Sequence, residues 1–120
     1  MMKNLEKGFS GENIAIEYLE KKGYKILARN WHSSHKEVDI IAEYNLELII
    51  VEVKTRTSNY FQEPENSVSR KKQKFLIDAT EKYIEKYNID KNVRFDIISI
   101  IQNEKEMKIN HIENAFAPNF

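Results

Sequence analysis

The sequence predicts an α/β domain in which a mixed β-sheet is flanked by helices, in the order helix, three strands, helix, two strands. Residues 1–120 are enough for a single domain with one core. Two amphipathic segments alternate with segments rich in Ile and Val. A helix between the third and fourth strands predicts a crossover connection, and the short connections elsewhere predict hairpins.

The composition is that of a soluble globular protein, with 41% hydrophobic and 32% charged residues. No apolar run approaches the roughly 20 residues of a membrane span, and no secretory signal is expected. The chain has no Cys, which excludes disulfides and thiolate metal sites and favours a cytoplasmic location. Because the formal net charge is zero, any nucleic-acid surface must come from local patterning.

The first helix is predicted over about residues 4–22, and Gly23 ends it as a C′ residue. One helix face is apolar, and it gathers Leu5, Phe9, Ala15, Ile16 and Leu19.

Three strands are predicted next, at 24–31, 37–44 and 46–54, because these segments are rich in Ile and Val. Asn45 suits a tight turn between the second and third strands, since Asn tolerates a left-handed backbone.

The second helix is predicted over about residues 67–87, with Ser67 as its N-cap. Its apolar stripe consists of Val68, Phe75, Leu76, Ala79 and Tyr83. Two further strands, at 93–101 and 106–112, follow around the turn "QNEK".

Charged residues gather where the central strand "LELIIVEVKTR" ends. A tight hairpin centred on Asn45 places Asp39 opposite Glu52, and Lys54 shares the face of Glu52. Two carboxylates about 5 Å apart repel each other on a sheet, and a hard cation such as Mg²⁺ relieves that repulsion. The alternative is a pair of strand ends whose charges are solvated or salt-bridged.

Glu12 falls near the centre of the apolar face of the first helix. A carboxylate there is costly unless it is paired or bound to a metal. It is either a third carboxylate of the metal site, with Gly8 and Gly11 bringing the helix close to the sheet, or a structural partner of Arg29 or Arg56.

Four cations occupy the first turns of the second helix, where the helix dipole disfavours them: Arg70, Lys71, Lys72 and Lys74. They predict a phosphate-binding surface, to which Lys54 and Arg56 belong, unless they are simply solvated. Lys72 lies on the apolar stripe and is therefore predicted to point toward the sheet.

The histidines are weaker candidates. His32 and His35 are predicted to be solvated in a loop, and His111 has no partner that the sequence reveals. Arg94 and Asp96 alternate on a strand, and we expect them to form a structural ion pair.

Several motifs occur in order along nearly the whole chain: Gly11-Glu12 with Ala15, Tyr18 and Leu19; Arg29-Asn30; "EVDII" at 37–41; "VEVKTR" at 51–56; "VSRKKQ" at 68–73; "RFD" at 94–96; "HIENAF" at 111–116. Together they resemble the YraN-like family of small bacterial proteins. The sequence is also similar to archaeal Holliday-junction resolvases, whose N-terminal helical glutamate corresponds to Glu12.

The resemblance implies a restriction-endonuclease-like fold with a metal-nuclease core made of Asp39, Glu52 and Lys54. Val38 stands where the wider superfamily often has proline. The expected activity is Mg²⁺- or Mn²⁺-dependent hydrolysis of DNA phosphodiesters, possible substrates being branched or recombination-intermediate DNA.

Each site residue has an expected role in that activity. Asp39, Glu52 and the Val53 carbonyl would ligate the metal, and Glu12 would bind a second metal or a water on the first. Lys54 would orient the attacking water. Phosphates would be held by the basic residues Arg56, Arg70, Lys71, Lys72 and Lys74.

Two other functions compete with a nuclease: a non-catalytic nucleic-acid-binding module that retains the fold, and a structural adaptor with an ion-pair network. A homodimer is a possible assembly, and no membrane partner is expected.

Overall fold

A computed structural model describes the backbone of residues 3–57 and 68–118, and the side-chain surroundings of residues 11–57 and 68–118. The elements are α1 (Lys3–Lys21), β1 (Lys25–Ser33), β2 (Lys36–Tyr44), β3 (Glu47–Arg56), α2 (Arg70–Tyr87), β4 (Asn92–Gln102) and β5 (Met107–Phe116). This order confirms the predicted α/β fold class, with a mixed sheet and two helices. No helix in the described part of the chain is long and apolar enough to cross a bilayer.

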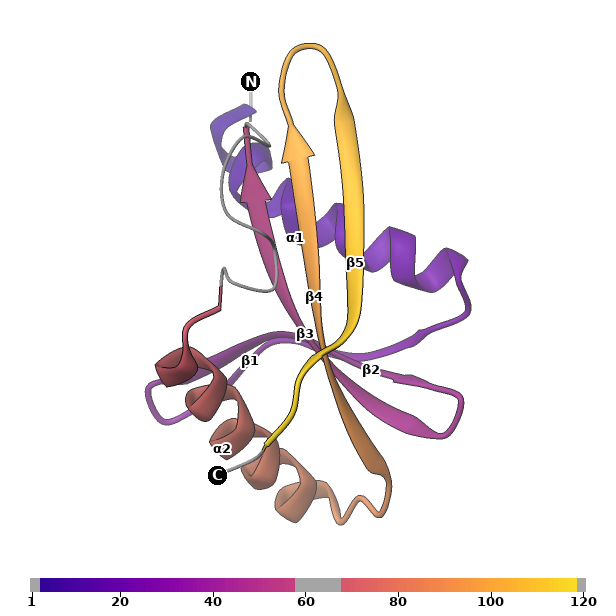
Figure 1. Ribbon diagram of the computed structural model, residues 1–120, viewed down its shortest axis with the longest axis vertical. Coiled ribbons are helices and arrows are strands. Elements are labelled where there is room, and N and C mark those ends of the chain that lie inside the picture. The colour runs from indigo at the N-terminus through magenta and orange to yellow at the C-terminus, as the bar shows by residue number, and fades with distance from the viewer. Residues whose placement is uncertain (1–2, 58–67, 119–120) are drawn as a thin grey trace.

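The five strands form one sheet in sequence order, β1-β2-β3-β4-β5. β3 and β4 are parallel and are joined through α2, whereas the other neighbours pair antiparallel. The crossover and the hairpins predicted from the connection lengths are therefore confirmed. Figure 1 shows the strong twist of the sheet and the β4–β5 hairpin extending past its neighbours.

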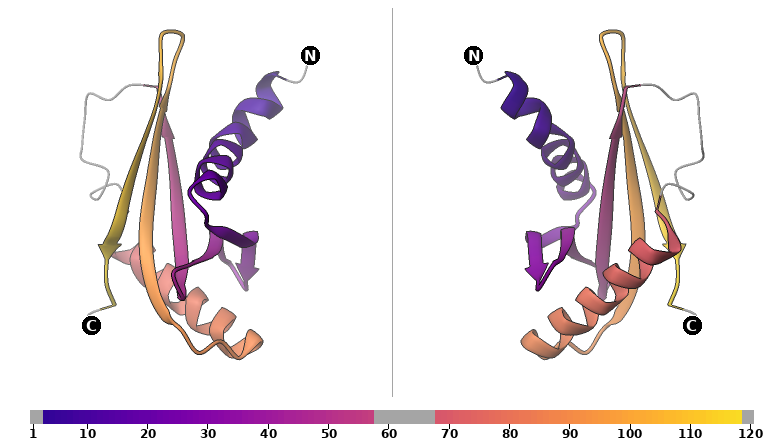
Figure 2. Two further views of the ribbon diagram at one scale, coloured as in Figure 1. Left: turned by 90° about the vertical axis from the view of Figure 1, so that its right-hand side faces the viewer. Right: turned by 90° about the vertical axis from the view of Figure 1, so that its left-hand side faces the viewer.

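The two helices cover opposite faces of the sheet (Figure 2). One core cluster joins α2 to the sheet through Leu76, Ala79 and Tyr83, and the other joins α1 through Ala15 and Leu19. Alternate residues of β3 supply the two clusters, which is why this strand is apolar on both faces.

α1 ends as predicted at Gly23, whose φ is 95°. The amide of Tyr24 donates to the carbonyl of Leu19, and the amide of Gly23 donates to that of Glu20, which is a Schellman motif. Nearer its start, α1 lies directly against β3, because a Cβ at Gly11 would overlap the hydroxyl of Thr55. The expected close approach of α1 at Gly11 is confirmed.

α2 begins later than predicted, and Ser67, which lies outside the described residues, was the wrong N-cap. The cap is Ser69, whose Oγ accepts from the Lys72 amide at 3.1 Å. Val68 precedes the helix and is buried in the core, so the chain turns into α2 only after it. Phe75 was also wrongly assigned to the buried stripe, because its exposed fraction is 40%.

The alternation of β2 is interrupted at Asp39. Val38 packs in the cluster of α2, whereas Ile40, two residues on, packs in the cluster of α1. Residues two apart on a regular strand share a face, so the strand must twist between them. On β1, Asn30 lies between the partners of Val38 and Ile40 and has a left-handed φ of 52°.

Candidate metal and nucleic-acid site

Asp39 lies where β2 and β3 separate. The ladder between these strands runs from Tyr44↔Glu47 to Ile40↔Val51, which is the register predicted from the Asn45 turn. Asp39 is not itself a ladder partner; instead its Oδ2 accepts a hydrogen bond from the Val53 amide at 2.9 Å. The carboxylate therefore fills the gap between the diverging strands.

Glu52 is the most buried carboxylate beside Asp39, with only 6% of its side chain exposed. Burial, and then repulsion from Asp39, raise its pKa from 4.5 to about 7, although Lys72 and Lys54 lower it. Burial also raises the pKa of Asp39, and the Val53 amide and Lys72 oppose that rise. The two carboxyls are close enough to affect each other, but the predicted direct pairing of Asp39 with Glu52 is wrong, because the ladder ends at Ile40↔Val51.

Two lysines reach Glu52 from different elements. Lys54 Nζ lies 3.8 Å and Lys72 Nζ 3.7 Å from Glu52 Oε2, so Lys72 does point toward the sheet. Both lysines lie on one side of the carboxylate. The other oxygen, Oε1, is buried and has no hydrogen-bond partner among the described residues.

Glu12 and Glu37 complete a group of carboxylates with Asp39. One carboxylate oxygen from each of the three lies within 4.8 Å of the others. Glu12 also contacts Arg29, with 3.5 Å between Oε1 and Nη2. Glu12 therefore makes both of the contacts predicted as alternatives, one with the carboxylate group and one with Arg29. Its side chain is 21% exposed rather than deeply buried.

The site is built by residues from both faces of the sheet. Glu52 is reached from the α2 face through Lys72, while Glu12 comes from α1 on the opposite face. The broken alternation at Asp39 is what allows Glu37 to join Glu12. On a regular strand, Glu37 would share the face of Asp39 and Glu52.

Glu37 is a candidate ligand that the sequence reasoning missed. Regular alternation gave no signal for this placement, because it would keep Glu37 on the sheet face opposite Glu12. Glu37 also lies 3.6 Å from His32, which belongs to the end of β1 and not to a loop as predicted.

The remaining predicted basic residues flank the start of α2 and the end of β3. Arg70, Lys71 and Lys74 are exposed on α2, and Arg56 is half-buried at the last position of β3. The structure does not test their predicted contacts with DNA phosphates or the predicted role of the Val53 carbonyl.

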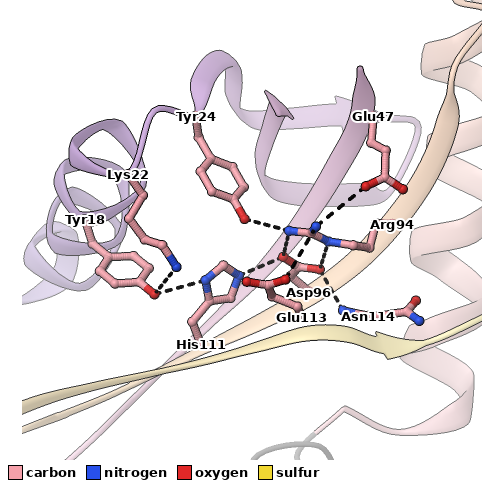
Figure 3. Close-up of polar contacts among 9 residues, drawn as sticks. All are labelled: Tyr18, Lys22, Tyr24, Glu47, Arg94, Asp96, His111, Glu113 and Asn114. Carbon is pink, nitrogen blue, oxygen red and sulfur yellow. Dashed lines mark hydrogen bonds and ion pairs between the residues drawn. The ribbon is translucent and has the colours of Figure 1, made fainter. Parts of the chain in front are cut away.

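A second polar cluster, which the sequence reasoning missed, ties α1 to β4 and β5 (Figure 3). His111 does have partners: its Nε2 lies 2.7 Å from Asp96 Oδ2, and its Nδ1 lies 3.1 Å from the Tyr18 hydroxyl. Asp96 also accepts two hydrogen bonds from Arg94, each at 2.9 Å, which confirms the predicted ion pair.

Asp96 is an ionised structural carboxylate. Burial alone would raise its pKa, but hydrogen bonds with His111, Arg94 and the Asn114 amide lower it below its ordinary value. Its side chain is fully buried, and its oxygens are all engaged by these partners. Asp96 therefore differs from Glu52, one of whose buried oxygens lacks a partner in the described part of the chain.

The carboxylate group suits a hard divalent cation. Its donor atoms are all carboxylate oxygens, which are ligands that Mg²⁺ and Mn²⁺ prefer. Burial of Glu52 Oε1 without a hydrogen-bond partner in residues 11–57 and 68–118 is costly, and a cation would relieve that cost of desolvation. The residues present fit the predicted ion: Glu12, Glu37 and Asp39 form the group whose oxygens lie within 4.8 Å of one another, and Glu52 lies beside Asp39 but outside that group.

Fold and site together define a class: small α/β proteins with a mixed five-stranded sheet and a carboxylate cluster at the point where two antiparallel strands separate. A family model described as the uncharacterised protein family UPF0102 matches residues 11–100. The chain belongs to this family, which confirms the resemblance found in its motifs.

Relatives of similar length extend the match over nearly the whole chain. A UPF0102 protein of Phocaeicola vulgatus is 47% identical over 98% of this chain and 98% of its own. The corresponding protein of Bacteroides thetaiotaomicron is 45% identical with the same coverage. One from Flavobacterium psychrophilum is 42% identical over 97% of this chain and 98% of its own. These names state a family and no activity.

Proposed function

We propose that this protein is a metal-dependent nuclease that hydrolyses phosphodiester bonds in DNA, with structured or branched DNA as its substrate. The observation that carries the proposal is the buried Glu52 Oε1 beside Asp39, which has no hydrogen-bond partner among the residues that the structure describes, with two lysines held against the other oxygen of Glu52. A purely structural ion-pair network would satisfy both oxygens, as the network around Asp96 does.

The carboxylates are assigned to cation binding. Asp39 and Glu52, with the Val53 carbonyl, would hold Mg²⁺ or Mn²⁺, and Glu12 would support a second ion or a bound water. Such an ion, when bound, supplies Lewis-acid chemistry at the phosphodiester. The Val53 amide keeps the Asp39 carboxylate in place through its 2.9 Å hydrogen bond.

The cations are assigned to the substrate. Lys54 is one-third exposed beside Glu52, so its ammonium can orient water and face the charge that develops on the phosphate. Lys72 lies against the same carboxylate and is 39% exposed, which lets it contact a phosphate from the side of α2. Arg56, Arg70, Lys71 and Lys74 would extend this contact along the DNA backbone.

The test compares cleavage and binding in two lysine variants. We expect Lys54→Ala to bind branched DNA nearly as wild type does while losing Mg²⁺- or Mn²⁺-dependent cleavage. Lys72→Ala should weaken binding and reduce the slope of log K against log salt by about one.

The exposed Lys82 on α2 offers a matched control, because Lys82→Ala removes a cation from the same helix but far from Glu52. Salt-dependent binding by wild type without metal-dependent cleavage of any DNA would identify a non-catalytic nucleic-acid module. The absence of both binding and cleavage would leave a structural adaptor.

A further inference from the structure

Phe75 is a large aromatic side chain left exposed on a helix whose neighbouring positions are buried. Its exposed fraction is 40%, whereas the next residue, Leu76, is 1% exposed. Exposing an aromatic ring forgoes the favourable burial that such a side chain would otherwise provide. A single exposed apolar residue is ordinary, so the surroundings of the ring decide whether it has a role.

Two lysines from different elements lie beside this ring. Lys36 Nζ, at the start of β2, is 5.5 Å from the ring centroid, and Lys71 Nζ, one turn earlier on α2, is 5.9 Å away. Both distances are within the range in which a cation is attracted to an aromatic ring. The ring and the two ammoniums thus form one surface, named here the Phe75 platform.

The Phe75 platform adjoins the carboxylate site on both elements that build it. Lys72 follows Lys71 on α2 and reaches Glu52 at 3.7 Å. Lys36 precedes Glu37 on β2, and Glu37 belongs to the carboxylate group with Asp39. The platform and the carboxylate site are therefore built from neighbouring positions of the same two elements, α2 and β2.

The chemistry of the platform matches a nucleotide whose base is unpaired. The ring offers a flat apolar surface for a base, and the flanking ammoniums offer contacts for the adjoining phosphates. Bases inside a duplex are stacked on each other and present only their edges, so they cannot lie on a protein ring. The same combination of aromatic and basic side chains is typical of proteins that hold single strands.

We propose that Phe75, flanked by Lys36 and Lys71, stacks on an unpaired DNA base beside the carboxylate site and so selects DNA with unpaired nucleotides over continuous duplex. This inference rests on the proposed function, because it names the substrate feature that the same site would recognise. It requires binding only, so it can be tested without cleavage.

The test uses two oligonucleotides of equal length in the absence of divalent ions. One is a duplex with 2-aminopurine in an unpaired segment, and the other is fully paired. Binding to wild type should quench 2-aminopurine, because stacking quenches this base. We expect Phe75→Leu to abolish the quenching and to weaken binding of the unpaired DNA about tenfold, with little effect on the paired DNA.

Two further variants separate stacking from charge. Phe75→Trp should retain the quenching, since Trp supplies a larger ring. Lys71→Met should weaken binding of both DNAs and lower the salt slope by about one. The matched control is Tyr87→Leu, which removes an exposed aromatic residue that also has a lysine beside it, Lys86 at 5.6 Å, but at the far end of α2.

Three results would overturn the proposal. Equal binding and quenching by wild type and Phe75→Leu would reject the role of the Phe75 platform. The proposed nuclease function would still stand if branched DNA is cleaved. A Phe75→Leu variant that changes from dimer to monomer in sedimentation, with equal losses for both DNAs, would assign the ring to a contact between copies. Failure of wild type to bind the unpaired DNA in preference to the paired DNA would reject this inference, and Mn²⁺-dependent cleavage of branched DNA would then decide the proposed function separately.

Discussion

The carboxyl group of Glu52 links the stability of the fold to pH. Its pKa is about 7 in the folded protein, compared with an ordinary value of 4.5. The folded state therefore holds this proton more tightly than the unfolded chain does. The resulting stability is fully present below pH 4.5 and is lost as the pH rises through about 7.

We expect Glu52→Gln to remove most of this pH dependence in metal-free protein. The neutral amide keeps the shape of the carboxyl group without its charge, so the variant should be more stable than wild type at pH 8, by at most about 3 kcal/mol. Urea denaturation at pH 5 and pH 8 in the presence of a chelator measures the effect. Mn²⁺ should stabilise wild type at pH 8 and not the variant.

An equal pH dependence in wild type and Glu52→Gln would show that Glu52 does not carry the buried charge. Glu104→Gln serves as a control, because Glu104 is exposed on the β4–β5 turn.

Glu12 is expected to matter more for metal affinity than for stability. Its ion pair with Arg29 spans 3.5 Å between partly exposed side chains, and such pairs contribute about 0–1 kcal/mol. Glu12→Gln should therefore melt close to wild type without metal but bind Mn²⁺ more weakly in calorimetric titration.

Arg29→Met is the matched variant for Glu12, since it removes the ion pair and leaves the carboxylates in place. Its Mn²⁺ affinity should stay at or above that of wild type. If both variants lose stability equally and both keep their Mn²⁺ affinity, Glu12 is a structural partner of Arg29.

Among the secondary-structure elements, the β1–β2 hairpin determines which carboxylates meet. Its strands twist at Asn30 and Asp39, so that Val38 packs with α2 and Ile40 packs with α1. The φ of 52° at Asn30 lies in the left-handed region that Asn and Gly tolerate and β-branched residues do not.

The Asn30 position can be tested with two substitutions. Asn30→Gly should preserve both the fold and the Mn²⁺ affinity, because Gly adopts this backbone freely. Asn30→Val should cost about 1–3 kcal/mol of stability and should weaken Mn²⁺ binding, since the strand would regain regular alternation and move Glu37 away. Thermal melting and Mn²⁺ titration measure the two effects, and equal affinities in both variants would contradict the role of the twist.

Considered as a whole, the molecule has two further contacts between α1 and the sheet beside the core of Ala15 and Leu19, and they differ in chemistry. Near the site the helix lies against Thr55 through Gly11 and contacts Arg29 through Glu12. Further along, Tyr18 contacts His111, which in turn contacts the buried Asp96. The second connection is saturated with hydrogen bonds and is suited to stability, whereas the first leaves carboxylates available for a cation.

We expect Asp96→Asn to be strongly destabilising, by about 3–5 kcal/mol, because it leaves Arg94 without its buried counter-charge. Urea denaturation at pH 7.5 measures this loss. Glu113→Gln removes another carboxylate 3.6 Å from the same guanidinium, but one that is 52% exposed, so it should cost less than about 1 kcal/mol. Equal losses in the two variants would show that the burial of Asp96 is not what stabilises the network.

The sequence alone was enough to predict features that depend on residues close together in the chain. The alternation of Ile and Val, the Gly23 stop and the tight turn at Asn45 determine the elements and their order. The hairpin register follows from that turn, and it brings Asp39 near Glu52, although the ladder ends at Ile40↔Val51 before the two residues become direct partners. The position of Lys72 on the stripe of α2 was likewise sufficient to direct it toward the sheet.

Tertiary structure decided what depends on contacts between distant segments. The partners of His111 come from α1 and β4, which no local pattern reveals. The exposure of Phe75 follows from where α2 begins and how it crosses the sheet, not from helical periodicity. Glu37 joins Glu12 because the strand twists at Asp39. With regular alternation, the side chain of Glu37 would lie on the face of the sheet opposite Glu12. Local propensities determine the periodicity with which side chains alternate along each helix or strand. The packing of these elements against one another determines which side chains meet.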